Sequence, residues 1–359
     1  MQTSSKPIQI TRASKWKRRL AFLILLLVGC IFLSLNFGFT QISFPDIFQI
    51  LLKNIPGIGN FVHLTEFQAS KEAIITLVRL PRILTGALVG AALAAAGTVF
   101  QGMFRNPMAD PYVVGASQGA ALGAAMAIVL GFGTSVLGTS ALPVVAFGGC
   151  LLSVLVVYSI SRVGSKVPMS TLLLSGIAVG LFEFALITYL QSIAGDKLGD
   201  LTFWIIGSLS SSRITWTGMF TIMPFIVIGI VISFLYSRDL NIIALGEDQA
   251  QHLGVNTERV KFILLISSAF MVAAAVSISG LIGFVGLMIP HVTRLLVGPD
   301  HRVLLPASLF LGASFLVLCD GLARILSSPS EVPVGVITVL LGVTFFLFLL
   351  RKKKRVDVF

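Results

Sequence analysis

The amino-acid sequence predicts an all-α protein that crosses a lipid bilayer about ten times. Of its 359 residues, 56% are hydrophobic and 11% are charged, and the mean hydropathy is +0.97. A soluble chain usually carries about a quarter charged residues, so this composition excludes a water-soluble class. A bilayer-spanning helix needs about 20 apolar residues, and the sequence contains many apolar runs long enough for that.

Ten apolar runs, bounded by charged residues, Gly, Pro or polar clusters, are the expected spans. They cover residues 20–39, 74–101, 112–130, 141–161, 171–194, 214–236, 259–277, 280–297, 303–320 and 334–350. The first run lacks a small-x-small cleavage site, which favours a retained helix over a signal peptide. A single transmembrane domain is therefore expected over residues 20–350.

The distribution of Lys and Arg predicts that both termini lie in the cytoplasm. An even number of spans puts the termini on one side, and cytoplasmic loops carry an excess of Lys and Arg. With cytoplasmic termini, nineteen of the 26 Lys and Arg lie inside. The seven outside are Lys53, Lys71, Arg79, Arg82, Lys197, Arg213 and Arg324. Topology and anionic lipid thus account for the basic tails, 1–19 and 351–359, without nucleic acid.

Three connecting segments are long enough to have structure of their own. Residues 40–73 and 195–213 would shape the external mouth, the second with a short helix near 203–206. The cytoplasmic loop 237–258 is predicted to form two short helices hinged near Gly246.

No pattern in the sequence indicates an enzyme. There is no phosphate-binding Gly-Lys-Ser/Thr loop, no acyl-transfer triad and no zinc-ligand spacing among His63, His252, His291 and His301. The three cysteines lie in apolar runs and are interpreted as inert lipid-facing or packing residues. We therefore expect no catalytic residue, metal or cofactor on this chain, and any use of ATP would need a partner.

Glu183 is the clear ionisable residue within a predicted span, and such residues are candidates for function. It could be the titratable carboxylate of a proton-coupled carrier. Alternatively, it is hydrogen-bonded to a neighbouring helix or faces a wet pore.

Charged residues also mark the predicted external helix ends. Asp320 and Glu331 flank Arg324 and suggest a local ion-pair cluster. Arg79, Arg82 and Arg324 lie on the side where basic residues are sparse. They could pair with carboxylates of a docking protein or simply extend to the lipid headgroups.

Three stretches resemble FecCD-type permeases, the family of iron-siderophore, haem and cobalamin importers of the ATP-binding-cassette (ABC) class. The first is RLPRILTGALVGAALAAAGTVFQGMFRNPMADPYVVGASQGA, and the second is ALGEDQAQHLGV in the cytoplasmic loop. The third is SGLIGFVGLMIPHVTRLLVGPDHRVLLPASLFLGAS, followed by EVPVGVITVLLG. Together they span most of residues 74–350 in the family's order.

The resemblance implies the type II ABC importer permease fold, in which two ten-helix subunits form a central pathway in the bacterial cytoplasmic (inner) membrane. It also implies the partners: a second copy of the chain, two cytoplasmic ATPases that carry ATP and Mg, and a periplasmic or lipid-anchored binding protein. The substrate expected first is a ferric siderophore, then haem, then cobalamin.

The resemblance assigns site residues by position. Arg79, Arg82 and Arg324 would dock the binding protein. Asn106 and Met108 would narrow the cytoplasmic end of the pathway, with Met169 and Ser170 as a second constriction. Met169 stands where the cobalamin permease has a hydroxyl residue. The residues expected to couple to the ATPases are Ala244, Leu245, Gly246, Glu247, Gln251, His252, Leu253 and Gly254.

Two interpretations remain open at this point. The family implies alternating access driven by a separate ATPase, with Glu183 as a candidate pore contact because the family has an apolar or small residue there. The alternative is an ion-coupled secondary transporter that acts without an ATPase, for which Glu183 and the Gly-interrupted helices are the supporting features.

Overall fold

The computed structural model describes residues 8–38, 40–57, 59–61, 64–131, 141–210, 214–327 and 330–356. The ends of both basic tails, His63 and Arg213 lie outside the described residues. The described chain is helical, with an isolated two-residue β-bridge between Val163 and Lys166.

The ten predicted spans each correspond to one apolar helix. Among the described residues, seven helices are long and apolar enough to cross a membrane, and three apolar helices are shorter. In chain order they are α1 (Ile8–Asn36), α4 (Leu80–Met103), α5 (Ala116–Val129), α6 (Ala141–Ser161), α7 (Met169–Ile193), α9 (Trp216–Leu235), α12 (Thr257–Ser279), α13 (Val285–Val297), α14 (His301–Leu326) and α15 (Val334–Val356). The predicted fold class, an all-α polytopic membrane protein, is confirmed.

The segment between α1 and α4 contains helices that the sequence reading missed. Helix α2 (Phe44–Lys53) begins at an N-cap, Ser43, and buries Ile47 and Ile50. Helix α3 (Glu66–Ala73) begins with a capping box at Thr65 and continues through a π-helical turn, Ile74–Arg79, into α4. Both helices are too short and polar to register as spans, so an apolar-run criterion overlooks them. The short helix expected near 203–206 is part of α8 (Leu198–Ile206).

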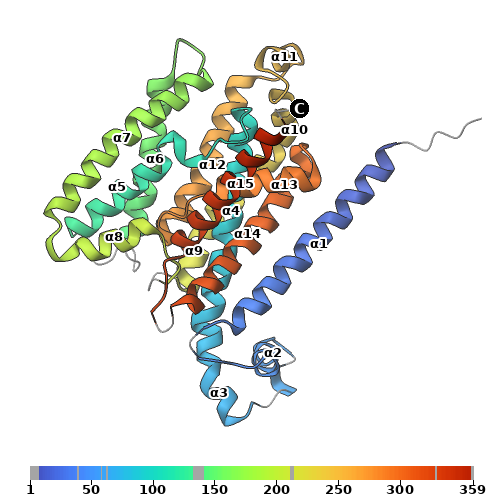
Figure 1. The fold of residues 1–359 in the computed structure, drawn as a ribbon, viewed down its shortest axis with the longest axis vertical. Coiled ribbons are helices and arrows are strands. Elements are labelled where there is room, and N and C mark those ends of the chain that lie inside the picture. Colours follow the sequence, from blue (N-terminus) through green and yellow to red (C-terminus); the bar gives the residue numbers. More distant parts are fainter. Residues whose placement is uncertain are drawn as a thin grey trace, which may run out of the picture.

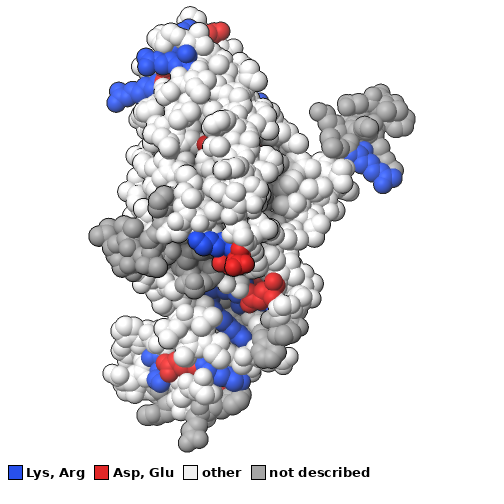
Figure 2. Space-filling model, turned by 90° about the vertical axis from the view of Figure 1, so that its left-hand side faces the viewer, with Lys and Arg blue, Asp and Glu red and all other residues white. Residues whose placement is uncertain are grey.

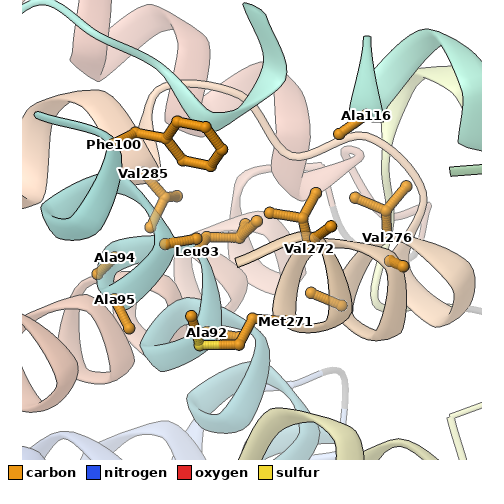
Figure 3. Close-up of a cluster of buried hydrophobic side chains, with 14 of the residues drawn as sticks. Ala92, Leu93, Ala94, Ala95, Phe100, Ala116, Met271, Val272, Val276 and Val285 are labelled. Carbon is orange, nitrogen blue, oxygen red and sulfur yellow. The ribbon is translucent and has the colours of Figure 1, made fainter. Parts of the chain in front are cut away.

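Helix α4 is the centre of the bundle because it is buried along nearly its whole length. It packs against α12, α13 and α14, and its small side chains let their backbones approach closely. Figure 3 shows Leu93 of α4 among buried side chains of α12 and α13, such as Val272 and Val285. A Cβ placed at Gly97 would lie 1.8 Å from the carbonyl oxygen of Gly286 in α13. A Cβ at Gly90 would lie 2.3 Å from that of Gly312 in α14. Glycine is therefore required at these two crossings.

The arrangement places the connecting loops at opposite ends of the bundle (Figure 1). Helices α5, α6 and α7 pack together on one side of α4, and α1 lies on the opposite side. The short helices α2 and α3 lie at the lower end, whereas α10 (Ser237–Ile243) and α11 (Glu247–His252) lie at the upper end. The start of α1 and the end of α15 are also at the upper end, as an even number of spans requires. Seen from the α7 side, a broad and nearly uncharged band lies below the charged upper end, and charged residues reappear from about mid-height downwards (Figure 2).

Candidate functional site

Two of the three predicted docking arginines share one carboxylate. Arg82 in α4 donates from Nε and Nη2 to Oδ1 of Asp320 in α14, at 3.0 and 2.8 Å. Its Nη1 lies 2.8 Å from an oxygen of Glu331. Arg324, one turn after Asp320, reaches the other Asp320 oxygen at 3.2 Å. The local ion-pair cluster expected around Arg324 is present, and Arg82 joins it from a distant part of the sequence.

The third arginine extends this network to the end of α1. Arg79 donates to the carbonyl oxygens of Leu35, at 2.6 Å, and Thr40. Arg324 donates to the carbonyl oxygen of Phe37 at 2.9 Å and to the hydroxyl of Ser34. We call Arg79, Arg82, Asp320, Arg324 and Glu331 the arginine cluster. It ties α1, α4 and α14 together at one end of the bundle.

The geometry changes what a docking role for these arginines would require. Arg79, Arg82 and Arg324 are only 5%, 9% and 5% exposed, and each already has partners within the chain. Side chains that are this buried do not extend to the lipid headgroups. An incoming carboxylate would have to displace these partners. Docking of a binding protein by the three arginines therefore stays a prediction.

Glu331 is the accessible member of the arginine cluster. Its side chain is partly exposed and lies in the connection before α15. Burial raises the pKa of Glu331, but the nearby charge of Arg82 and hydrogen bonds from Ser210 and Arg82 together hold it below its usual value. Glu331 therefore remains a carboxylate at neutral pH and is the member that a partner could most easily displace.

The 237–258 loop forms the two short helices that the sequence predicted. Helices α10 and α11 are separated at Gly246, whose φ of 140° lies in the region that favours glycine. Ala250 is the buried residue of α11, whereas Leu245 and Leu253 are 64% and 65% exposed. Two large exposed apolar side chains on a polar loop are typical of a protein-docking surface.

The other predicted coupling residues lie on the same loop in varied surroundings. Ala244, His252 and Gly254 are exposed, and Gly246 and Glu247 are half-buried. The amide of Gln251 donates to the hydroxyl of Thr257 at 3.1 Å, which fastens α11 to the start of α12. The loop therefore presents an accessible surface and is fixed at its base.

Helix α10 is fastened to the start of α14 through Asn241. The side-chain Nδ2 of Asn241 donates to Oδ1 of Asp300 at 2.8 Å, and its side-chain Oδ1 accepts from the backbone N–H of His301 at 2.8 Å. Asp300 also caps α14 and pairs with Arg302. The hydrogen bond from Arg302, and then that from Asn241, lower the pKa of Asp300 to about 2 against the effect of burial.

The predicted gate residues lie in two separate segments. Asn106 and Met108 are exposed in the loop after α4, where the side-chain oxygen of Asn106 accepts from the backbone N–H of Met108. Met169, half-buried, and Ser170, exposed, are the first residues of α7. No hydrogen bond joins the two pairs among the described residues, so a gate between them stays a prediction.

Glu183 does not lie on an exposed face of α7. It is 7% exposed and lies on the buried face with Ser175, Gly176 and Ile187, while Phe182 and Phe184 point outward. A Cβ placed at Gly115 would lie 3.9 Å from its Oε2, which has no hydrogen-bond partner. The structure thus places Glu183 in the packing of α5, α6 and α7 of its own chain, and a contact with the pathway stays a prediction.

Two long-range connections escaped the sequence reading. Arg82 and Asp320 are 238 residues apart, and nothing local links them. Lys261, near the start of α12, is buried and forms an ion pair with Glu247 of α11. The local signal for Lys261 was its spacing of three residues from Glu258, with which it also pairs.

Comparisons with known proteins agree with this architecture. Residues 25–352 match the FecCD transport family. The chain is 45% identical to the cobalamin import system permease protein BtuC of Halobacterium salinarum, over 79% of this chain and 74% of that protein. It is 37% identical to the hemin transport system permease protein HmuU of Yersinia pestis, over 93% and 96%. A solved inward-facing, metal-chelate type ABC transporter matches with a TM-score of 0.79 and 33% identity, over 94% of this chain and 99% of that one.

Proposed function

Because the chain belongs to the FecCD transport family, and is thus an ABC importer permease, we propose that two copies of it form the membrane pathway for a metal chelate. ATP binding and hydrolysis would belong to two separate ATPase subunits on the cytoplasmic side. A binding protein on the other side would deliver the chelate. Both termini and the 237–258 loop would face the cytoplasm.

The observation that carries this proposal is the form of the 237–258 loop. It has two short helices, exposed apolar side chains at Leu245 and Leu253, and anchors to both α12 and α14. An independent carrier has no need for such a surface. A subunit that receives movement from an ATPase needs both an accessible contact and firm attachment to the bundle.

At the opposite end, we propose that the arginine cluster receives the binding protein. Asp320 and Glu331 would hold Arg82 and Arg324 in place until carboxylates of the partner compete for them. Since Glu331 is the accessible carboxylate, its pair with Arg82 would open first.

The proposed substrate class comes from the named relatives and from membership of the family. Ferric siderophore, haem and cobalamin are the candidates; one relative is named for cobalamin import and another for hemin transport. All three are large metal chelates, and a pathway walled by small and apolar side chains would bind them weakly.

The proposed mechanism is alternating access. Closure of the ATPase dimer would move α10 and α11, and the segments that carry Asn106, Met108, Met169 and Ser170 would switch between two arrangements. This chain would supply the pathway and the coupling, while the ATPases supply the chemistry.

The test is reconstitution of the permease in proteoliposomes with its cognate ATPase and binding protein. ATP hydrolysis should rise when the binding protein carries ferric siderophore, hemin or cobalamin, and the chelate that stimulates it is the substrate. The result that would overturn the proposal is uptake that follows a proton gradient and needs no ATPase. That result would favour the secondary carrier, for which the buried and unpartnered oxygen of Glu183 is the supporting observation.

A further inference from the structure

Lys261 joins three segments that are separate in the sequence. Its side chain begins in α12, and its ammonium group lies 3.0 Å from Oε2 of Glu247 in α11. It also forms an ion pair with Glu258 in α12 and donates to the carbonyl oxygen of Val167 at 3.0 Å. A lysine has three N–H donors, and these three contacts use all of them.

Val167 is held from both sides by this group of charges. While its carbonyl oxygen accepts from Lys261, its backbone N–H donates to Oε2 of Glu258 at 2.8 Å. Val167 is itself buried and lies two residues before Met169, with Pro168 between them as the N-cap of α7. Lys261 and Glu258 therefore hold the backbone just before α7, and not a side chain that could rotate away.

The connection between α6 and α7 is short and internally bonded. The N–H groups of Val163 and Lys166 donate to each other's carbonyl oxygens, at 2.9 and 3.2 Å. Since Pro168 fixes its own φ, little freedom remains between this turn and the first residues of α7. Displacement of Val167 would carry Met169 and Ser170 with it.

The same loop also approaches the other predicted gate segment. A Cβ placed at Gly246 would lie 3.8 Å from Nη1 of Arg105, the residue before Asn106. The region around α11 is thus next to both segments that carry gate residues. It is linked to the α7 segment through the Glu247–Lys261 ion pair and the hydrogen bond from Lys261 to the carbonyl oxygen of Val167.

Burial explains why this contact should resist breaking. Lys261 is 3% exposed, and a buried ammonium group that loses its partners is strongly destabilising. Stabilisation of α12 alone does not explain a lysine at this position, because a cation near a helix N-terminus opposes the helix dipole. Helix α11 has only six residues, so its position depends on anchors such as Glu247 and Ala250.

We propose that Lys261 is a positioning residue that transmits movement of α11 to the start of α7, so that Met169 and Ser170 follow the ATPase-bound loop. The inference rests on the proposed function for the source of that movement. It adds a specific route: Glu247 in α11, Lys261 in α12, Val167 at the root of α7.

The first arm of the test measures transported substrate per ATP hydrolysed in the reconstituted importer. Glu247→Gln keeps the side-chain shape but removes the negative charge that pairs with Lys261. Lys261→Met removes the ammonium group itself. The matched control is Lys166→Met, an exposed lysine in the turn before α7. Transport per ATP should fall about tenfold in the first two variants, within the usual range for coupling between two sites, and stay near wild type in the control. Equal losses of transport and hydrolysis, or no loss in Glu247→Gln, would overturn the inference.

The second arm measures position directly and needs no ATPase. Spin labels on cysteines at Ser165 and Asp248, both exposed, report the distance between the root of α7 and α11 in the permease in lipid nanodiscs. The distance distribution should be narrow in the wild type and in Lys166→Met, and about twofold broader in Glu247→Gln and Lys261→Met; an unchanged width would refute the tie. If no ATPase associates with the wild type, the proposed function fails, while the label widths still decide whether Lys261 holds the two segments together.

Discussion

Arg82 and Asp320 form a buried ion pair between α4 and α14, with Nη2 and Oδ1 2.8 Å apart, although 238 residues separate them in the chain. The pair lies at the end of two helices that also pack backbone to backbone at Gly90 and Gly312. Close backbone packing thus brings the two charges together, and the charges fix the ends of both helices.

Asp320→Asn should destabilise the protein strongly. The change leaves Arg82 and Arg324 without their shared charge in a buried position, and loss of one partner of a buried ion pair typically costs about 3–5 kcal/mol. Thermal unfolding in detergent should show a clearly lower midpoint. Glu331→Gln, at the more exposed member, is the control and should have the smaller effect.

Glu331→Gln should instead remove part of the pH dependence of stability. The pKa of Glu331 is lower in the folded chain than its ordinary 4.5, so its contribution is complete above about 4.5 and is lost as the pH falls through the folded value. Unfolding midpoints between pH 7 and pH 3 should drop less steeply in Glu331→Gln than in the wild type. Parallel curves would show that the pair with Arg82 contributes nothing.

Gly97→Ala should separate α4 from α13. The new Cβ would lie 1.8 Å from the backbone oxygen of Gly286, which cannot rotate away, so the helices must shift at a cost of about 1–3 kcal/mol or more. Gly148→Ala in α6 is the matched control, because nothing lies within 4 Å of a Cβ there. Gly97→Ala should unfold at a lower temperature than Gly148→Ala, and equal unfolding temperatures would contradict the packing described for α4.

Asp300→Ala should loosen the attachment of α10. The carboxylate caps α14 and accepts from Asn241, and loss of a cap costs about 0.5–2 kcal/mol. Because the pKa of Asp300 is lowered to about 2, this stabilisation is complete above its unfolded value near 3.8 and disappears only as the pH falls toward 2. Hydrogen exchange in α10 should be faster in Asp300→Ala at neutral pH, and an unchanged rate would contradict the link.

Leu253→Glu should prevent association with the ATPase. The side chain is 65% exposed, so folding should be unaffected, whereas a charge within an apolar contact opposes binding. Co-purification of a tagged ATPase should fall at least about tenfold, since a lost hot-spot contact of about 1.4 kcal/mol or more changes affinity by that factor. Val163→Glu, also exposed at 61%, is the control.

The spans were predictable because hydrophobicity is a local property of the chain. Each apolar run had to become a helix, since unpaired backbone groups are too costly in hydrocarbon. The helices α2 and α3 were not predicted, because their amphipathic or polar sequences only become informative once Ser43 and Thr65 are recognised as caps. The loop helices α10 and α11 were predicted correctly from the glycine at 246.

The candidate site divides in the same way. The sequence identified Arg79, Arg82 and Arg324 as unusual, but their burial and their partners at the end of α1 appear only in the fold. It identified Glu183 as costly in a membrane, but not that it faces α5 and α6. Within two turns of a helix the side chains point to all sides, so the position of a residue in the sequence does not say whether its side chain faces a neighbouring helix.

The sequence by itself therefore determined the membrane class, the ten helices and the loop with its hinge at Gly246, since each depends on residues close together in the chain. Only the tertiary structure decided that Arg82 pairs with Asp320 and that Lys261 reaches Val167. Those contacts depend on which helices cross and at what distance. That distance is set by small residues on two separate helices, such as Gly97 and Gly286, and only packing brings them together.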